Sequence, residues 1–239
     1  LALAPGANGS VWAGTPDGLN HIAGTRVEAY TSADGLPDDF IRSLLLGSDG
    51  SLWIGTRRGL ARWQNKTFTT YTQADGLKSN LIGALVQSHT VSSPSDKSEP
   101  DLWIGTLDGI ARLSDGKLTT YTTKDGLSGN VITSLLEDSQ NTLWIGTKGG
   151  GLSRSTSSGF VTMRRRDLPR AIDSILEDDH GNLWLSSTHG ITRVSRSALI
   201  ACGSSPDCSP HPESYGRSDG MPTEEASAIG HTATWKHHQ

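Results

Sequence analysis

The sequence LWIGT occupies residues 52–56, 102–106 and 143–147, and two variants of it, VWAGT and LWLSS, occupy residues 11–15 and 183–187. Its tryptophans, 41, 50, 41 and 40 residues apart, are Trp12, Trp53, Trp103, Trp144 and Trp184. A period near 40 residues has room for four short strands in each unit. The longest interval contains SHTVSSPSDKSEP (88–100), which lacks an apolar pattern and is typical of an exposed insertion.

Four strand signals recur within each unit. In the second unit, IRSLLLG (41–47) precedes LWIGT, and GLARW (59–63) and FTTYT (68–72) follow it. Branched apolar residues and Thr/Tyr alternation favour strands, and the Gly, Asn and Asp residues between them favour tight turns. The pattern therefore predicts four antiparallel strands in each unit.

Three successive large apolar residues in LWIGT place side chains on both faces of one strand. Both faces must then be buried, as in sheets stacked around an axis, whereas a sandwich usually leaves one face wet. A helical solenoid is excluded because no unit has a 3.6-residue period, and only SRSALIAC (195–202) resembles a helix.

The sequence thus predicts an all-β fold: a fragment of a β-propeller with about five four-stranded blades, spanning residues 1–239 as one partial domain. The expected blades are approximately 1–33, 34–73, 74–123, 124–164 and 165–217, with the start of a next blade at 218–239. An open ring leaves unpaired sheet edges, so we expect a longer natural polypeptide whose full propeller has about seven blades.

Composition and charge exclude some functions. The formal charge of −4 gives no basic field for nucleic acid. No stretch has the length of a membrane-spanning helix, and the first residues carry no export signal. Cys202 and Cys208 lie six residues apart in CGSSPDC, where a disulfide and two free thiols fit about equally well.

The repeat resembles that of the two-component regulator propeller family. The resemblance rests on I-x-S-L-L-E-D, L-W-I-G-T-x-x-G-x-x-R and the D-G-L or D-G-M turns at Asp34, Asp75, Asp125 and Asp219. It implies the periplasmic sensor region of a membrane-anchored hybrid histidine kinase or related regulator. SYGRSDGMPTEEAS (214–227) resembles the last blades, which precede an immunoglobulin-like linker domain. Sialidase Asp boxes and streptogramin lyase-like propellers are the rival families.

Residues that recur in every blade are explained most simply by the fold. The acidic residues Glu137 and Asp138 occupy the same place as Glu177, Asp178 and Asp179, so we expect them to cap turns rather than to act as acid/base pairs. Asn80 and Asn130 follow D-G-L at the same spacing and are interpreted in the same way. The repeated tryptophans are expected to be core rather than sugar-stacking residues.

Residues that break the repeat are the better functional candidates. Four antiparallel strands per blade bring the loop between strands two and three to the same rim as the loop between blades. The candidate ligand-binding residues on this rim are Arg57, Arg58, Asp108, Lys148, Arg164, Arg165, Arg170 and His189; Asp38, Asp39, Lys78 and Arg166 share it. The arginines could hold an anionic group through bidentate contacts, although a solvated rim of scattered charge is the simpler interpretation.

The family resemblance implies a ligand-sensing or interaction segment outside the cytoplasm, and it suggests a carbohydrate or a similar small or polymeric ligand. The expected partners are this ligand and the remaining blades and linker domain of the same polypeptide. The insertions at 88–100 and about 197–212 share the opposite rim, where they could contact a neighbouring domain or the second subunit of a homodimer. No catalytic residue, metal site or cofactor motif is expected. The alternatives are a propeller lyase or glycosidase, and a plain scaffold.

Overall fold

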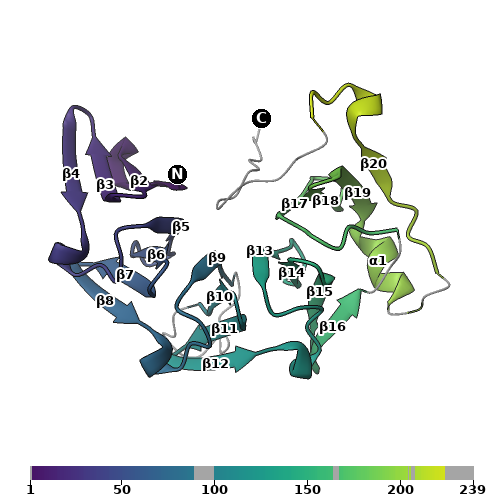
Figure 1. The fold of residues 1–239 in the computed structure, drawn as a ribbon, viewed down its shortest axis with the longest axis horizontal. Coiled ribbons are helices and arrows are strands. Elements are labelled where there is room, and N and C mark those ends of the chain that lie inside the picture. The colour runs from purple at the N-terminus through teal and green to yellow at the C-terminus, as the bar shows by residue number, and fades with distance from the viewer. Residues whose placement is uncertain (1, 89–99, 164–166, 204, 206–207, 224–239) are drawn as a thin grey trace. The chain divides into compact units, whose positions relative to one another are not determined.

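The fold is that of a computed structural model, which describes residues 2–88, 100–163, 167–203, 205 and 208–223. These residues form five antiparallel four-stranded sheets in which consecutive strands are neighbours (Figure 1). The all-β fold predicted from the repeat is therefore confirmed, and we call each sheet a blade. The chain divides into two compact units, Leu1–Thr120 and Tyr121–Gln239.

The first unit contains three blades. Blade 1 comprises β1 (Ala2–Pro5), β2 (Val11–Thr15), β3 (Gly18–Ala23) and β4 (Arg26–Tyr30); blade 2 comprises β5 (Ile41–Leu46), β6 (Leu52–Thr56), β7 (Leu60–Gln64) and β8 (Thr67–Tyr71); blade 3 comprises β9 (Ile82–Gln87), β10 (Leu102–Thr106), β11 (Gly109–Ser114) and β12 (Lys117–Tyr121). Its short 3₁₀ helices are Ala7–Gly9, Ser32–Asp34 and Gln73–Asp75.

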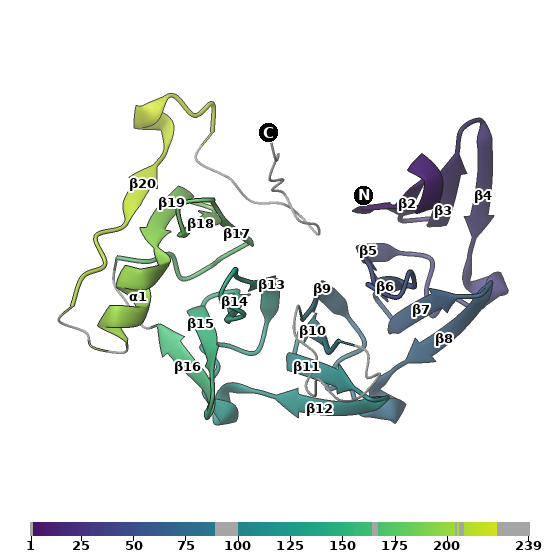
Figure 2. The same cartoon turned by 180° about the vertical axis from the view of Figure 1, so that it is seen from behind.

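The second unit contains two blades. Blade 4 comprises β13 (Ile132–Glu137), β14 (Leu143–Thr147), β15 (Gly151–Thr156) and β16 (Gly159–Met163); blade 5 comprises β17 (Ser174–Glu177), β18 (Asn182–Ser187), β19 (Gly190–Ser195) and β20 (Glu213–Tyr215). The helix expected near 195–202 is α1 (Arg196–Cys202), which contacts β19 of its own blade (Figure 2). The short 3₁₀ helices of this unit are Thr123–Asp125 and Arg217–Asp219.

Strand β6 shows why LWIGT determines the fold. All five of its residues are buried. Leu52 and Ile54 pack into the apolar cluster shared with blade 1, whereas Trp53, which points the opposite way, packs into the cluster shared with blade 3. Alternate side chains of one strand thus join two different neighbours, as the burial of both faces predicts.

The repeated tryptophans are not equally buried, and this corrects the sequence interpretation. Trp12, Trp53 and Trp144 are buried as expected, but Trp103 and Trp184 are only partly buried. The Trp103 Nε1 donates to the Ser88 hydroxyl at 3.3 Å, and the guanidinium of Arg112 lies over the ring, 5.8 Å from its centroid.

The D-G-L turns close through one repeated set of hydrogen bonds. Asp34 Oδ2 accepts the backbone N–H of Thr31 at 2.8 Å, and Asp75 and Asp125 accept equivalent bonds at the same distance. The following glycine is left-handed, with φ of 112° at Gly35, a conformation that costs glycine little. The Leu36 side chain, next in sequence, is then buried in the core between blades 1 and 2.

The predicted turn-capping role is confirmed for Asp138 and Asp178. Asp138 Oδ1 accepts the backbone N–H of Thr142 at 2.8 Å, and its Oδ2 accepts the indole N–H of Trp144 at 2.7 Å. Asp178 makes the same bonds with Asn182 and Trp184. Burial raises the pKa of the Asp178 carboxyl, but hydrogen bonds from Asn182, Trp184 and His180 outweigh burial and hold the pKa well below its usual range.

Glu177 has a different role from the one expected. Its carboxylate caps the turn of the preceding blade, because Oε2 accepts the backbone N–H of Ser139 at 2.7 Å. It also binds Arg196, the first residue of α1, at 2.6 Å. The contact between blades, rather than its own turn, therefore explains this carboxylate.

The two cysteines are joined in the structure. Cys202 at the end of α1 and Cys208 form a disulfide with their Cα atoms 5.4 Å apart. This decides between the two states that the sequence left open. Within the described ranges, no helix combines the length and the apolar character that a bilayer span requires.

Candidate functional site

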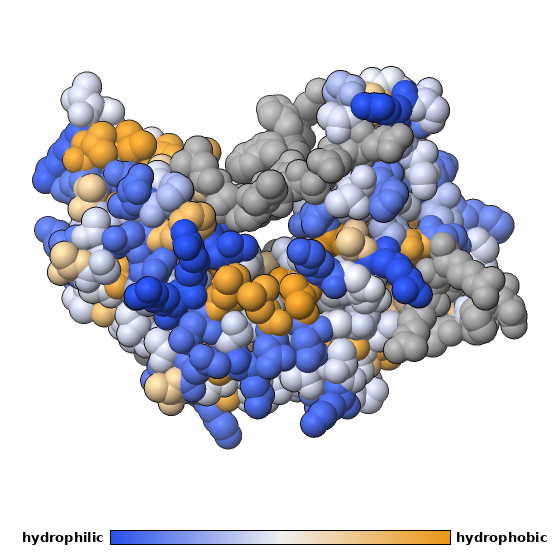
Figure 3. Space-filling view, viewed as in Figure 1, coloured by the Kyte–Doolittle hydropathy of each residue, from blue (hydrophilic) through white to orange (hydrophobic). Residues whose placement is uncertain are grey.

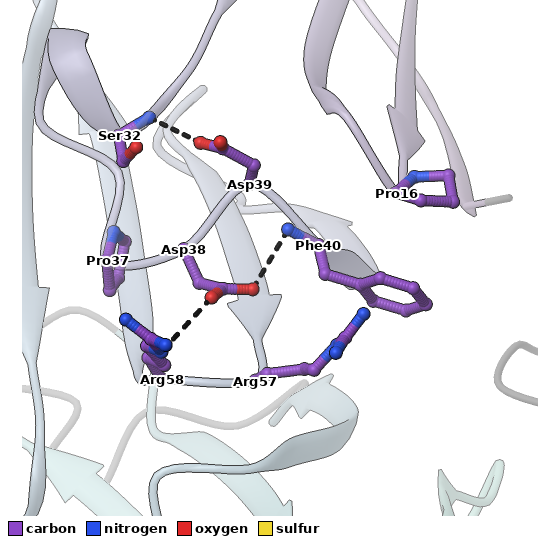
Figure 4. A pocket seen from close by; sticks show the side chains of 8 residues that line it. All are labelled: Pro16, Ser32, Pro37, Asp38, Asp39, Phe40, Arg57 and Arg58. Carbon is purple, nitrogen blue, oxygen red and sulfur yellow. Dashed lines mark hydrogen bonds and ion pairs between the residues drawn. The ribbon is translucent and has the colours of Figure 1, made fainter.

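The β6–β7 hairpin and the segment joining blade 1 to blade 2 enclose an open depression of about 290 Å³ in the first unit. Figure 4 shows Arg57 and Arg58 reaching it from the hairpin, opposite Pro16 of the β2–β3 hairpin. Its lining residues are Pro16, Ser32, Pro37, Asp38, Asp39, Phe40, Arg57 and Arg58. The structure thus brings two of the predicted site residues together with the interblade segment, as the rim topology predicts.

Both aspartates of the depression hold its backbone. Asp39 Oδ1 accepts the backbone N–H of Ser32 at 2.6 Å, in the place where Asn80 Oδ1 accepts that of Gln73 in the next blade. Asp39 is therefore the blade 1 form of a repeated turn residue. Asp38 Oδ1 accepts the backbone N–H of Phe40 at 3.0 Å, so it also fixes the loop.

The two arginines of the hairpin have different surroundings. Arg58 Nε lies 3.4 Å from Asp38 Oδ2, which partly neutralises it (Figure 4). Arg57 instead lies over the Phe40 ring, with Cζ 3.8 Å from the ring centroid. Arg57 is exposed, and this cation–π contact favours the placement of its guanidinium over the ring. Among the described residues, no carboxylate forms an ion pair with Arg57.

Sequence reasoning missed Arg42, on β5. The register between β5 and β6 passes from Ile41, paired with Thr56, to Ser43, paired with Gly55, so Arg42 is the extra residue of a β-bulge. Its Nε is buried and has no hydrogen-bond acceptor in the described part of the chain. Burial lowers the pKa of Arg42, and the nearby charge of Arg57 lowers it further.

A comparison of blades would have revealed Arg42. The residue that follows the first isoleucine of each inner strand is Arg42 in blade 2, Gly83 in blade 3, Thr133 in blade 4 and Asp173 in blade 5. The isoleucine recurs and is buried, whereas the next residue changes its chemistry in every blade. A position whose residue type differs in every blade, directly after an isoleucine that recurs, is the sequence signal that was overlooked.

The other predicted site residues do not join this depression. Asp108, on the β10–β11 hairpin of the first unit, and Lys148, Arg170 and His189, in the second unit, are all exposed. The His189 ring lies 3.0 Å from the Thr188 hydroxyl, and the Arg170 carbonyl accepts backbone N–H groups of the β14–β15 turn. Arg164 and Arg165 lie outside the described residues, as does Arg166.

Asp173 Oδ2 is buried and has no hydrogen-bond partner in the described part of the chain. Burial raises the pKa of Asp173, and the charge of Lys148 opposes that rise. The described residues contain no group of three or more His, Cys, Asp or Glu side chains placed to hold a metal ion.

Blade 1 carries four of the six large apolar side chains that are exposed among the described residues of the first unit. Val11 pairs with Ile22, which pairs with Val27, so the three lie in one row across β2, β3 and β4. They are 38%, 37% and 60% exposed, and Leu3 of β1 is 63% exposed. Figure 3 shows apolar surface over this blade at the upper left. In blade 2, the equivalent residues Leu52 and Trp63 are packed against blade 1.

Two segments of the chain, residues 35–58 and 126–149, match the family described as "Two component regulator propeller". Each segment runs from the glycine of a D-G-L turn through the inner strand to the hairpin after LWIGT. The first contains Arg42, Arg57 and Arg58. The family resemblance predicted from the repeat is therefore confirmed. No curated protein is similar enough to match the chain.

Solved structures share the fold. The extracellular domain of the putative hybrid two-component system BT3049 from B. thetaiotaomicron is 21% identical, with a TM-score of 0.70 over 93% of this chain. The corresponding domain of BT4673 is 18% identical, with a TM-score of 0.68 over 90%. This chain spans only 29% and 31% of those domains.

Virginiamycin B lyase from Staphylococcus aureus is 19% identical, with a TM-score of 0.63 over 82% of this chain and 66% of its own. A propeller enzyme is thus also among the similar structures. At these identities the similarities establish the fold alone.

Proposed function

We propose that this chain, which carries two-component regulator propeller repeats, is a ligand-sensing segment of a bacterial signalling receptor. The segment binds a carbohydrate-type ligand outside the cytoplasm, in the periplasm, and passes the signal through a linker domain to a membrane-anchored kinase or regulator. The segment itself is non-catalytic. Similar folds in extracellular domains of putative hybrid two-component systems support this proposal.

The observation that carries the proposal is the arginine-lined depression of blade 2. Its aspartates repeat the fold's own turn contacts, but Arg57 and Phe40 replace other residue types in the remaining blades. An open depression with fixed donors and an aromatic ring has the features of a small-ligand site. A ligand that binds this rim more tightly in one conformation of the receptor than in another favours that conformation. The resulting movement of the propeller against the linker domain then changes the activity of the kinase.

Further blades of the same repeat are the proposed intramolecular partner. The apolar row Val11, Ile22 and Val27 occupies the face that, in blades 2 and 3, is covered by the preceding blade. Covering it with another blade removes exposed apolar surface that would otherwise favour association. Replacing Val27 with cysteine tests this contact in a polypeptide that includes the further blades. A thiol reagent should label Val27→Cys slowly there, because another blade covers it, and should label the control Arg26→Cys quickly.

The test of the sensing function is calorimetric titration of the chain with a panel of oligosaccharides, with turnover of each followed in parallel. Saturable binding without product supports the sensing segment. The lyase similarity makes the parallel assay decisive. Product formation that one carboxylate or histidine substitution abolishes would establish an enzyme instead.

A further inference from the structure

We propose that Arg42 and Arg57 together bind the anionic group, a carboxylate or sulfate, of an acidic saccharide, and that Arg58 is a structural partner of Asp38. This inference rests on the proposed sensing function and specifies its ligand.

The first step is the charge balance of the depression. Asp38 is engaged by Arg58 at 3.4 Å and by the Phe40 backbone N–H, and Asp39 is engaged by Ser32. Neither carboxylate forms an ion pair with Arg57, which lies over the Phe40 ring. Arg42 is not among the residues that line the depression, but it follows Ile41, which pairs with Thr56, the residue before Arg57. The charge of Arg57 adds to burial in lowering the pKa of Arg42. Two neighbouring cations without a described counter-ion favour a bound anion.

The second step is the hydrogen-bonding capacity of Arg42. A buried guanidinium nitrogen without an acceptor is costly, because the N–H loses water and gains no partner. The bulged residue of blade 4, Thr133, uses its side chain within the fold, donating its hydroxyl to the Ile172 carbonyl. Arg42 makes no such contact among the described residues. Arg42 is the extra residue of a bulge, and bulges often turn a side chain toward a functional site.

The third step is a comparison with blades 4 and 5. The residue after the LWIGT threonine is Arg57 in blade 2 and Lys148 in blade 4. The residue of blade 5 that corresponds to Arg42 is Asp173; burial raises its pKa and the charge of Lys148 opposes that rise, although no ion pair joins these two side chains. The residue at that position of blade 3 is Gly83, which has no side chain to offer Arg57. The following blade thus carries a carboxylate at this position in the second unit and no side chain in the first.

Planar guanidinium groups match the oxygen geometry of carboxylate and sulfate through paired N–H donors. Arg57 also presents this fork at the opening of the depression, where a large ligand can reach it (Figure 4). A saccharide bearing an acidic group is therefore favoured over a neutral one.

The test uses three matched trisaccharides: one ending in glucuronate, one ending in 6-O-sulfated glucose, and the neutral parent ending in glucose. Calorimetry with chain 1–239 should show at least one acidic form binding about tenfold or more tightly than the neutral form, as one charge-assisted contact allows. The two acidic forms distinguish a carboxylate from a sulfate ligand.

Three variants assign the donors. Arg57→Gln should remove the preference for the acidic form, and Arg42→Met should weaken it, whereas Arg58→Gln should change affinity less than about twofold. Gly83→Asp supplies the carboxylate that blade 5 has, and should also weaken acidic binding. Because Arg57 is exposed, Arg57→Gln keeps the test valid even if a strand variant fails to fold.

The outcomes separate the two proposals. Equal binding of acidic and neutral forms, unaffected by Arg57→Gln, would overturn this inference and leave saccharide sensing intact. An Arg58→Gln loss as large as that of Arg57→Gln would overturn the assignment of donors. Absence of binding by all three probes would overturn this inference, whereas the proposed sensing function is overturned only if the wider oligosaccharide panel also fails to bind.

Discussion

Arg196 should hold blade 5 against blade 4, and replacing it with methionine tests this. Its Nη1 donates to Glu177 Oε1 at 2.6 Å and to the Ser139 hydroxyl at 2.9 Å, and lies 3.8 Å from Asp138 Oδ2. The side chain of Arg196 is 16% exposed, that of Glu177 11% and that of Asp138 0%. Removing the cation leaves two nearly buried carboxylates facing each other.

The magnitude follows from this burial. Removing one partner of a buried ion pair costs about 3–5 kcal/mol, because the other charge remains desolvated. Glu177 keeps two hydrogen bonds from Ser139, and Arg196 retains some contact with solvent, so the lower end, about 3 kcal/mol, applies. In a unit of this size, such a loss lowers the unfolding midpoint by about 10 °C.

Scanning calorimetry of chain 1–239 measures the midpoint, and hydrogen exchange of β13–β19 peptides shows whether the loss falls in the second unit. The matched control is Arg193→Met, because Arg193 pairs with Glu213 at 3.1 Å on the surface and should change the midpoint little. Adding Glu177→Gln to Arg196→Met should restore part of the stability. Equal midpoints for Arg196→Met and Arg193→Met would refute the reasoning.

Three further predictions concern the second unit. Replacing Cys202 and Cys208 with serine should cost about 2 kcal/mol, since the bridge closes a short loop, and should raise hydrogen exchange in α1. Because the folded pKa of Asp178 lies below its unfolded value, its contribution is present above about pH 4 and is lost as the pH falls; Asp178→Asn should flatten this part of an acid-unfolding curve. Gly126→Ala should destabilise more than Gly116→Ala in urea unfolding, because both glycines have positive φ but only the Cβ at 126 would overlap a backbone carbonyl.

Most of the fold was predictable because the blade is specified locally and then repeated. LWIGT requires two buried faces, and the structure packs Leu52 and Trp53 into different clusters. The D-G-L sequence contains the residue that caps its turn, because Asp75 accepts a hydrogen bond from the backbone N–H of Thr72, three residues earlier. The turn contacts lie within a few residues, so one copy of the pattern contains them; the packing of LWIGT joins neighbouring blades and follows from repetition of the pattern.

The candidate site was less predictable because its contacts cross from one strand to another. Rim topology placed Arg57 and Arg58 correctly beside Asp38, but only coordinates show that Arg58 is the one that Asp38 engages. Arg42 was missed because a bulge, which depends on strand register, separates it from its neighbours in the pairing.

The repeat also explains why function should concentrate at so few positions. Turn closure and core packing are carried by residues that recur, so a blade stays folded whichever side chain occupies its bulge or the position after its threonine. Blades 4 and 5 fill these positions with Lys148 and Asp173; burial raises the pKa of Asp173, and the charge of Lys148 opposes that rise. Blade 2 fills both of its own positions with arginine; burial lowers the pKa of Arg42, and the charge of Arg57 lowers it further. If the proposed anion binds at Arg42 and Arg57, it should relieve the repulsion between them, so ligand binding and local stabilisation would be coupled there.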